Sequence, residues 1–224
     1  MSKSIATVSL CLVCLLAGLA GFESVAHAQN FVAELGTIKA VSQSKETLGR
    51  VYVSGSKVRI ETRDQADGFF VVNADQPAAW FVRPRQRVFM DARRSSPWTQ
   101  VLVRVDPADA CRQWEAMESI AGATSGGGGW RCERIGTQDV NGHEALKYEV
   151  TSRDGRRSYR WIDPLRQFPI RLESWDGSVV TLDAIVDAPQ ASTLFTVPAG
   201  FRKFDPLQLI EQIKLSDVWV EPHK

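Results

Sequence analysis

Residues 78–90 read AAWFVRPRQRVFM, two apolar runs separated by a basic turn. Both runs contain the aromatic and β-branched residues that are enriched in strands, and Pro84 favours a turn between them. The segment therefore predicts a β-hairpin with a broad apolar surface and arginines at its end. No residue in it suggests a catalytic role, so the function of this surface has to be inferred from the rest of the chain.

Turn signals recur on both sides of this hairpin. Asn141-Gly142, Asp154-Gly155 and Asp176-Gly177 each stand between short runs rich in Val, Ile, Phe, Tyr and Trp. Asn-Gly and Asp-Gly between such runs are strong signals for hairpins. The pattern predicts an antiparallel meander of about ten strands.

Alternation along the runs predicts their faces. In residues 57–61, Val58 and Ile60 point to one side, and in residues 157–161 Tyr159 and Trp161 lie opposite Arg160. Residues 69–72 and 79–82 do not alternate and are apolar throughout. We therefore expect both faces of that part of the sheet to be covered.

Residues 106–120 break the strand rhythm and predict a helix of about 14 residues. Asp106 is its expected cap and Pro107 its first helical residue. Ala110, Trp114, Met117 and either Ile120 or Ala121 recur at helical spacing. This helix is expected to cover the apolar face of the sheet.

The remaining segments complete a single predicted domain, residues 29–224. The glycine-rich run 122–129 reads as a connector, and residues 206–214 predict a second short helix capped by Asp205. The predicted fold is mainly β with a few helices, a curved antiparallel half-barrel lidded by one or two helices.

The first 28 residues have the features of a secretory signal peptide. Lys3 precedes an apolar run over residues 5–22, and Ala26-His27-Ala28 forms a small-residue cleavage site. A membrane anchor is the alternative, since the run approaches a spanning length. The signal-peptide reading predicts a periplasmic protein with no integral membrane segment after cleavage.

Two of the four cysteines follow the predicted cleavage site, Cys111 and Cys132. In an exported chain they are expected to form a disulfide, which would stabilise the fold by roughly 3 kcal/mol in the chain-entropy model. The alternative, a redox pair, lacks the Cys-x-x-Cys spacing.

Several classes of function find no support. The 27 basic and 26 acidic residues are balanced, so nucleic-acid binding is not expected. The glycine run lacks the Gly-Lys-Ser/Thr of a phosphate loop, and no Gly-x-Ser-x-Gly elbow is present. His143 and His223 do not form a metal-ligand pattern. We expect no enzymatic activity, no metal and no cofactor; a hydrolase dependent on His143 ranks last.

Arginines cluster around two predicted hairpins. Arg83, Arg85 and Arg87 lie in the first, near Arg93 and Arg94, and the second is flanked by Arg153, Arg156, Arg157 and Arg160. Arginine forks suit phosphate and carboxylate groups, which makes the first three candidates for contact with a lipid headgroup or a partner. The alternative is that they are solvated turns protecting a sheet edge.

Four stretches form a further pattern: LGRVYVSGSKVRIE at 48–61, VVNADQPAAW at 71–80, RPRQRVF at 83–89 and LFTVPAGF at 194–201. Together they resemble the periplasmic lipoprotein-carrier (LolA-like) superfamily. The resemblance implies an incomplete antiparallel barrel that holds lipid or acyl chains under helices. One departure is that a strand-like segment, residues 31–35, stands where the characterised carriers begin with a helix.

The expected function is therefore binding or carriage of a lipid, a lipoprotein acyl chain or another hydrophobic ligand in a cleft under a helical lid. The alternative is an envelope protein-interaction or stress-sensing module on the same fold. Expected partners are a lipid or an acylated protein, or another envelope protein. The predicted lining is Val58, Ile60, Phe70, Val72, Trp80, Val82 and Phe89, with Trp114 and Met117 from the lid.

Overall fold

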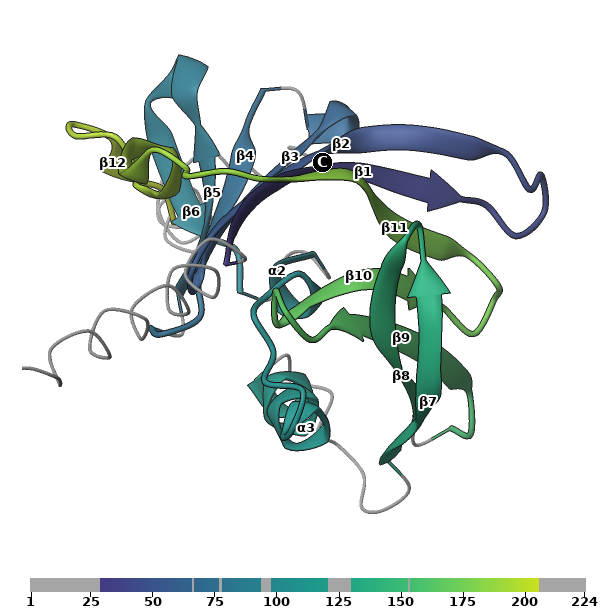
Figure 1. Cartoon of the computed structure of the whole chain (residues 1–224). Coiled ribbons are helices and arrows are strands. Elements are labelled where there is room, and N and C mark those ends of the chain that lie inside the picture. Colours follow the sequence, from purple (N-terminus) through teal and green to yellow (C-terminus); the bar gives the residue numbers. More distant parts are fainter. Residues whose placement is uncertain are drawn as a thin grey trace, which may run out of the picture.

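One continuous curved sheet dominates the computed structural model (Figure 1). The structure describes residues 29–65, 67–76, 78–93, 98–120, 130–152 and 154–205. The predicted signal peptide, the glycine connector, the predicted second helix, Arg94, Arg153 and His223 lie outside these residues. So do the side chains of Glu118, Ser119 and Ile120.

The sheet has twelve strands over the described residues, in the order β12-β6-β5-β4-β3-β2-β1-β11-β10-β9-β8-β7. Every neighbouring pair is antiparallel except β12 and β6. The strands are β1 (Asn30–Ile38), β2 (Lys45–Ser54), β3 (Lys57–Thr62), β4 (Phe69–Asn73), β5 (Ala78–Arg83), β6 (Val88–Asp91), β7 (Arg131–Val140), β8 (His143–Thr151), β9 (Arg157–Asp163), β10 (Phe168–Glu173), β11 (Val179–Asp187) and β12 (Arg202–Lys203).

The mainly β half-barrel predicted from the sequence is confirmed, with more strands than expected. Two meanders, β1 to β6 and β7 to β11, join where β1 pairs with β11. The short β12 adds the one parallel pairing among the described residues. Helices α2 (Trp98–Val101) and α3 (Ala110–Ile120) connect the meanders on the concave side of the sheet (Figure 1).

The concave side holds the main hydrophobic core. Val58 and Ile60 of β3 point into it and are fully buried, as their alternation predicted. Phe31 meets Phe168 edge to face at 5.3 Å, so the core spans both meanders. Trp114 of α3 is 1% exposed, because it inserts into this core.

A second apolar cluster lies on the opposite face of β4, β5 and β6. Phe69, Val71 and Val82 are buried there, since every second residue of the uniformly apolar strands faces away from the main core. The segment after β11 supplies the cover with Val197 and Phe201. The expectation that both faces are covered is confirmed.

That covering segment includes a 3-10 helix, η3 (Ser192–Phe195), and ends in β12. Two further 3-10 helices, η1 (Arg63–Gln65) and η2 (Pro84–Gln86), stand at strand ends. η2 is the basic turn of the hairpin quoted above, and Arg87 closes it with a left-handed backbone at φ 51°.

Helix α3 begins at Ala110, three residues after Pro107, the first helical residue predicted for it. Asp106 instead closes a turn, since its carboxylate accepts the amide of Ala108. The hydroxyl of Tyr148 donates to the carbonyl of Pro107 at 2.6 Å, which holds that residue against β8. Asp106 and Pro107, which the sequence assigned to the helix start, thus form a turn and a contact with β8 instead.

Cys111 and Cys132 form the predicted disulfide, with their Cα atoms 5.5 Å apart. The bridge joins α3 to the first residues of β7. Among the described helices, none is long and apolar enough to span a membrane.

Candidate functional site

An apolar cavity of about 310 Å³ lies between the helices and the sheet. Its sheet wall comes from β4 and β5 through Val72 and Ala79, and its other wall comes from Val103, in the connection after α2, and from Met117 of α3. Pockets that bind small molecules range from ~300 to ~1,000 Å³, so this one suits a short or partly inserted ligand.

Polar side chains surround this apolar floor and are held in place by hydrogen bonds. Arg104 donates through Nε to Gln167 at 2.9 Å, and Arg93 donates through Nε to Asp91 at 2.9 Å. Gln100 donates to the carbonyl of Arg93 at 3.1 Å. The cavity therefore combines apolar walls with two ordered guanidinium groups, an arrangement that fits an amphipathic molecule.

Six of the nine residues predicted to line a cleft lie on the concave side. Val72 and Met117 border the cavity. Val58, Ile60, Phe70 and Trp114 are instead packed in the main core, each at most 3% exposed. The concave side is thus largely filled by the protein's own side chains.

The other three predicted lining residues, Trp80, Val82 and Phe89, lie on the opposite face. Trp80 and Phe89 contact edge to face at 5.3 Å within the outer cluster. The nine residues therefore do not share one surface. Because both faces of β4 and β5 are apolar, the sequence pattern did not separate the two sets.

Sequence reasoning missed the residues that leave the cavity open. Ala74, Ala78, Ala79 and Ala116 border it, and their small side chains leave room between sheet and helix. The sequence feature that could have indicated them is the alanine-rich stretch 74–79, where the first apolar run ends and the second begins. Only the packing of α3 above it gives those alanines a role.

The arginines of the predicted contact set differ in their environments. Arg83 donates through Nε to Asp67 at 2.8 Å, so its charge is paired. Arg85 and Arg87 are exposed. Arg85 and Arg87 therefore stay available to a ligand in solution, whereas Arg83 has a structural contact.

His143 lies in an ionic network. Arg166 is 8% exposed, donates to Asp163 and Asp187, and has a nitrogen 3.3 Å from Nδ1 of His143. The two carboxylates hold the pKa of the Arg166 guanidinium above its usual value against the opposing effect of burial. Within the described residues, no group of three or more His, Cys, Asp or Glu could hold a metal ion.

Comparison with solved structures finds several proteins that this chain is similar to at low sequence identity. A LolA superfamily protein from Nitrosomonas europaea matches at a TM-score of 0.33 and 12% identity, over 77% of this chain and 94% of that one.

Two other matches have higher TM-scores. An uncharacterized conserved protein from Thermus thermophilus gives 0.45 at 12% identity, over 79% of this chain and 90% of that one. MucB gives 0.43 at 15% identity, over 79% of this chain and 61% of that one. At these identities the likeness concerns the fold alone. No protein-family model and no curated protein matches the sequence.

Proposed function

We propose that the protein is a periplasmic binding protein that holds a hydrophobic or amphipathic ligand, such as a lipid or an acyl chain, between the sheet and its helices. The observation that carries this proposal is the apolar cavity between β4, β5, α2 and α3. The proposal includes export of residues 29–224 and no catalytic activity, metal or cofactor.

The cavity supports binding of part of an acyl chain. Burying each CH₂ group contributes about 0.8 kcal/mol, so a short inserted segment already gives measurable affinity. Arg93 and Arg104 border the same cavity and would meet a polar or anionic head. A longer chain would require α3 to move away from the sheet, which the Cys111–Cys132 bridge restricts at one end.

A direct test is mass spectrometry of organic extracts from protein purified from the periplasm without detergent. A stoichiometric lipid or acylated molecule is the expected result. An empty extract, together with a melting temperature that added fatty acids do not change, would contradict the proposal.

A variant localises the ligand to the cavity. Met117→Lys places a charge on the cavity wall and is expected to weaken binding of a fluorescent fatty acid at least tenfold. Ala108→Lys adds the same charge at an exposed residue just before α3 and serves as the control. Equal affinities in the two variants would place the ligand elsewhere.

Interaction with another envelope protein is the second candidate function, and strand β7 favours it. Eight of its ten residues are exposed, and no strand of the described chain pairs with its outer edge. An extended peptide can add to such an edge by main-chain hydrogen bonds. The substitution Thr137→Pro should abolish partner capture in cross-linking experiments without changing fatty-acid binding.

A further inference from the structure

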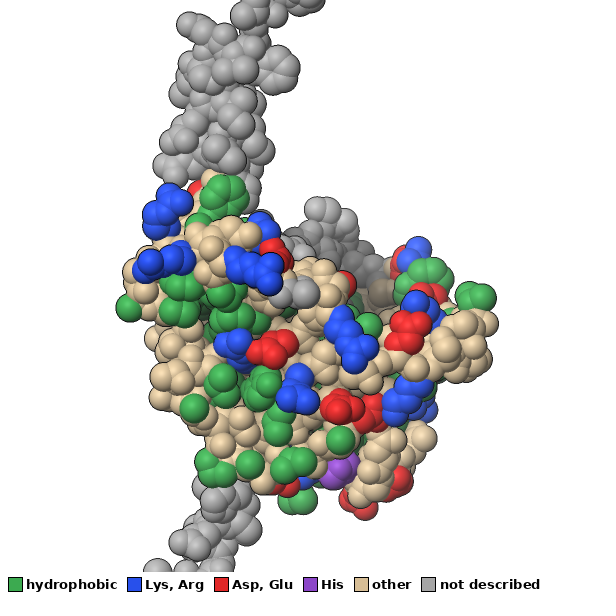
Figure 2. Space-filling model, turned by 90° about the horizontal axis from the view of Figure 1, so that it is seen from above, with side chains coloured by type: hydrophobic (Ala, Val, Ile, Leu, Met, Phe, Trp, Pro, Cys, Tyr) green, Lys and Arg blue, Asp and Glu red, His purple; other side chains and the backbone are tan. Residues whose placement is uncertain are grey.

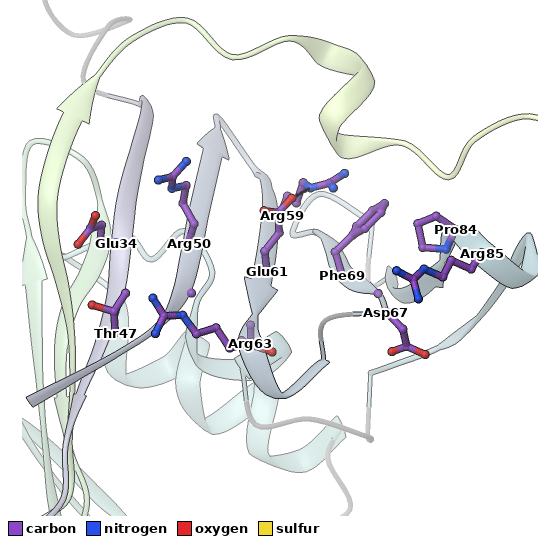
Figure 3. A pocket seen from close by; sticks show the side chains of 13 residues that line it. Glu34, Thr47, Arg50, Arg59, Glu61, Arg63, Asp67, Phe69, Pro84 and Arg85 are labelled. Carbon is purple, nitrogen blue, oxygen red and sulfur yellow. Dashed lines mark hydrogen bonds and ion pairs between the residues drawn. The ribbon is translucent and has the colours of Figure 1, made fainter.

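A larger pocket, about 660 Å³, lies on the other face of the sheet from the apolar cavity (Figure 3). Charged side chains of β1, β2 and β3 form one side, and residues around η1, β4 and η2 form the other. Its charged and apolar lining includes Glu34, Arg50, Arg59, Glu61, Arg63, Asp67, Phe69, Pro84 and Arg85. Basic and acidic side chains are interspersed on this outer face (Figure 2).

Arg59 is immobilised in the middle of the pocket by contacts on three sides. Its Nε donates to Glu61 at 2.7 Å, and a terminal nitrogen donates to the carbonyl of Leu194 at 3.2 Å. Its guanidinium also stacks over the ring of Phe69, 3.4 Å from the centroid. Arg59 and Glu61 thus form an internally paired centre.

The acidic group on the opposite side is paired as well. Asp67 accepts hydrogen bonds from Arg83, whose side chain is outside the pocket lining. Asp67 and Glu61 are therefore engaged by Arg83 and Arg59, and Glu61 also attracts Arg50, which stands opposite it on β2. Arg63 and Arg85 have no such carboxylate partner among the described residues.

Of the remaining arginines, Arg63 and Arg85 are available to a ligand. Arg50 makes a hydrogen bond with Tyr52, which holds the pKa of its guanidinium above the usual value. Arg63 and Arg85 are exposed and make no hydrogen bond or ion pair with any other residue that the structure describes. Figure 3 shows Arg63 reaching under Arg50 and Arg85 entering from the side of η2.

We propose that this outer pocket is a second binding site, for organic anions whose carboxylate or phosphate groups are held by Arg63 at one end of the pocket and by Arg85 at the other (Figure 3). Guanidinium forks bind both groups with two parallel hydrogen bonds. The apolar part of such a ligand would lie against Phe69 and Pro84, which border the same pocket. The site is on the opposite face from the cavity of the proposed function, so either assignment can fail without the other.

Calorimetric titration with inorganic phosphate and with citrate, at constant ionic strength, tests this site. Saturable binding of at least one of the two anions is expected, and comparing them identifies the preferred acid group. The double variant Arg63→Gln/Arg85→Gln should lose at least tenfold in affinity. Its melting temperature should not change, because neither side chain has a described partner.

The matched control is Arg87→Gln/Arg112→Gln, which removes the same charge from exposed arginines outside the pocket. If the control weakens binding as much, the effect is one of overall charge and the site is refuted. Absence of saturable binding to either anion also overturns the proposal. Binding only to vesicles of phosphatidylglycerol would replace a soluble anion with a membrane surface as the ligand.

Discussion

Arg160 and Trp161 are neighbours in β9, and it is the charged residue, not the aromatic one, that faces the helix. Arg160 faces the helix and stacks over Trp114, 4.5 Å from the ring centroid. Trp161 is 2% exposed on the opposite side, where Lys147 and Arg171 lie over its ring. Alternation predicted that these residues point to opposite sides, but it did not predict which side meets the helix.

Tyr148 gives a prediction at the same scale. Its hydroxyl bonds to Pro107 and its ring meets Trp114 at 5.4 Å, so Tyr148→Phe should lower the free energy of unfolding at neutral pH by about 1 kcal/mol. Chemical denaturation of both proteins measures this difference.

The same residue predicts a pH dependence. Burial raises the pKa of the Tyr148 hydroxyl above its ordinary value of 10.0, so the folded state binds this proton more tightly than the unfolded state. Its contribution to stability is complete below pH 10 and falls as the pH rises toward the folded pKa. The gap between wild type and Tyr148→Phe should therefore narrow above pH 10. A constant gap would contradict this explanation.

At the scale of the element, α3 is held by a covalent bond at its first turn and by burial of one face. The Cys111–Cys132 bridge closes a loop that contains the glycine run. Ala110 and Trp114 are buried, whereas Met117, one turn further on, is only half-buried. The cavity therefore lies beside the part of α3 that is less buried and farther from the disulfide.

Replacing both cysteines by alanine tests the role of the bridge. We expect a loss of about 3 kcal/mol in the free energy of unfolding, because the unfolded chain gains freedom in the loop. Urea denaturation measures it, and wild type treated with a reductant should show the same loss. A change below about 1 kcal/mol would mean that packing alone holds the helix.

At the scale of the whole molecule, β1 unites the two meanders. It pairs with β2 on one side and β11 on the other, and Leu35 stands opposite both Gly49 and Leu182. The main core includes residues from both meanders around it. The two halves should therefore unfold together.

Fluorine NMR of labelled tryptophan tests this cooperativity, since Trp80 lies in the first meander and Trp161 in the second. Both signals should disappear at one urea concentration. Leu35→Ala should shift both midpoints equally and cost ~2–5 kcal/mol, as a buried leucine does. Glu34→Ala, at the exposed neighbouring position, is the control. Separate midpoints in wild type would show two independent units.

The sequence alone determined the local features of this protein. Turn residues placed the hairpins, alternation sorted Val58 and Ile60 to one face, and the two cysteines indicated their own pairing. These features depend on neighbouring residues and on short loops, so the sequence pattern contains them.

Only the tertiary structure decided which surfaces meet. The pairing of β1 with β11 joins segments more than a hundred residues apart, and the faces of β4 and β5 are equally apolar. The cover over Phe69, the cavity beside Ala79 and the two arginines of the outer pocket that have no partner among the described residues all follow from those contacts. Such contacts depend on how whole elements pack, and periodicity within one strand or helix carries no information about its partner.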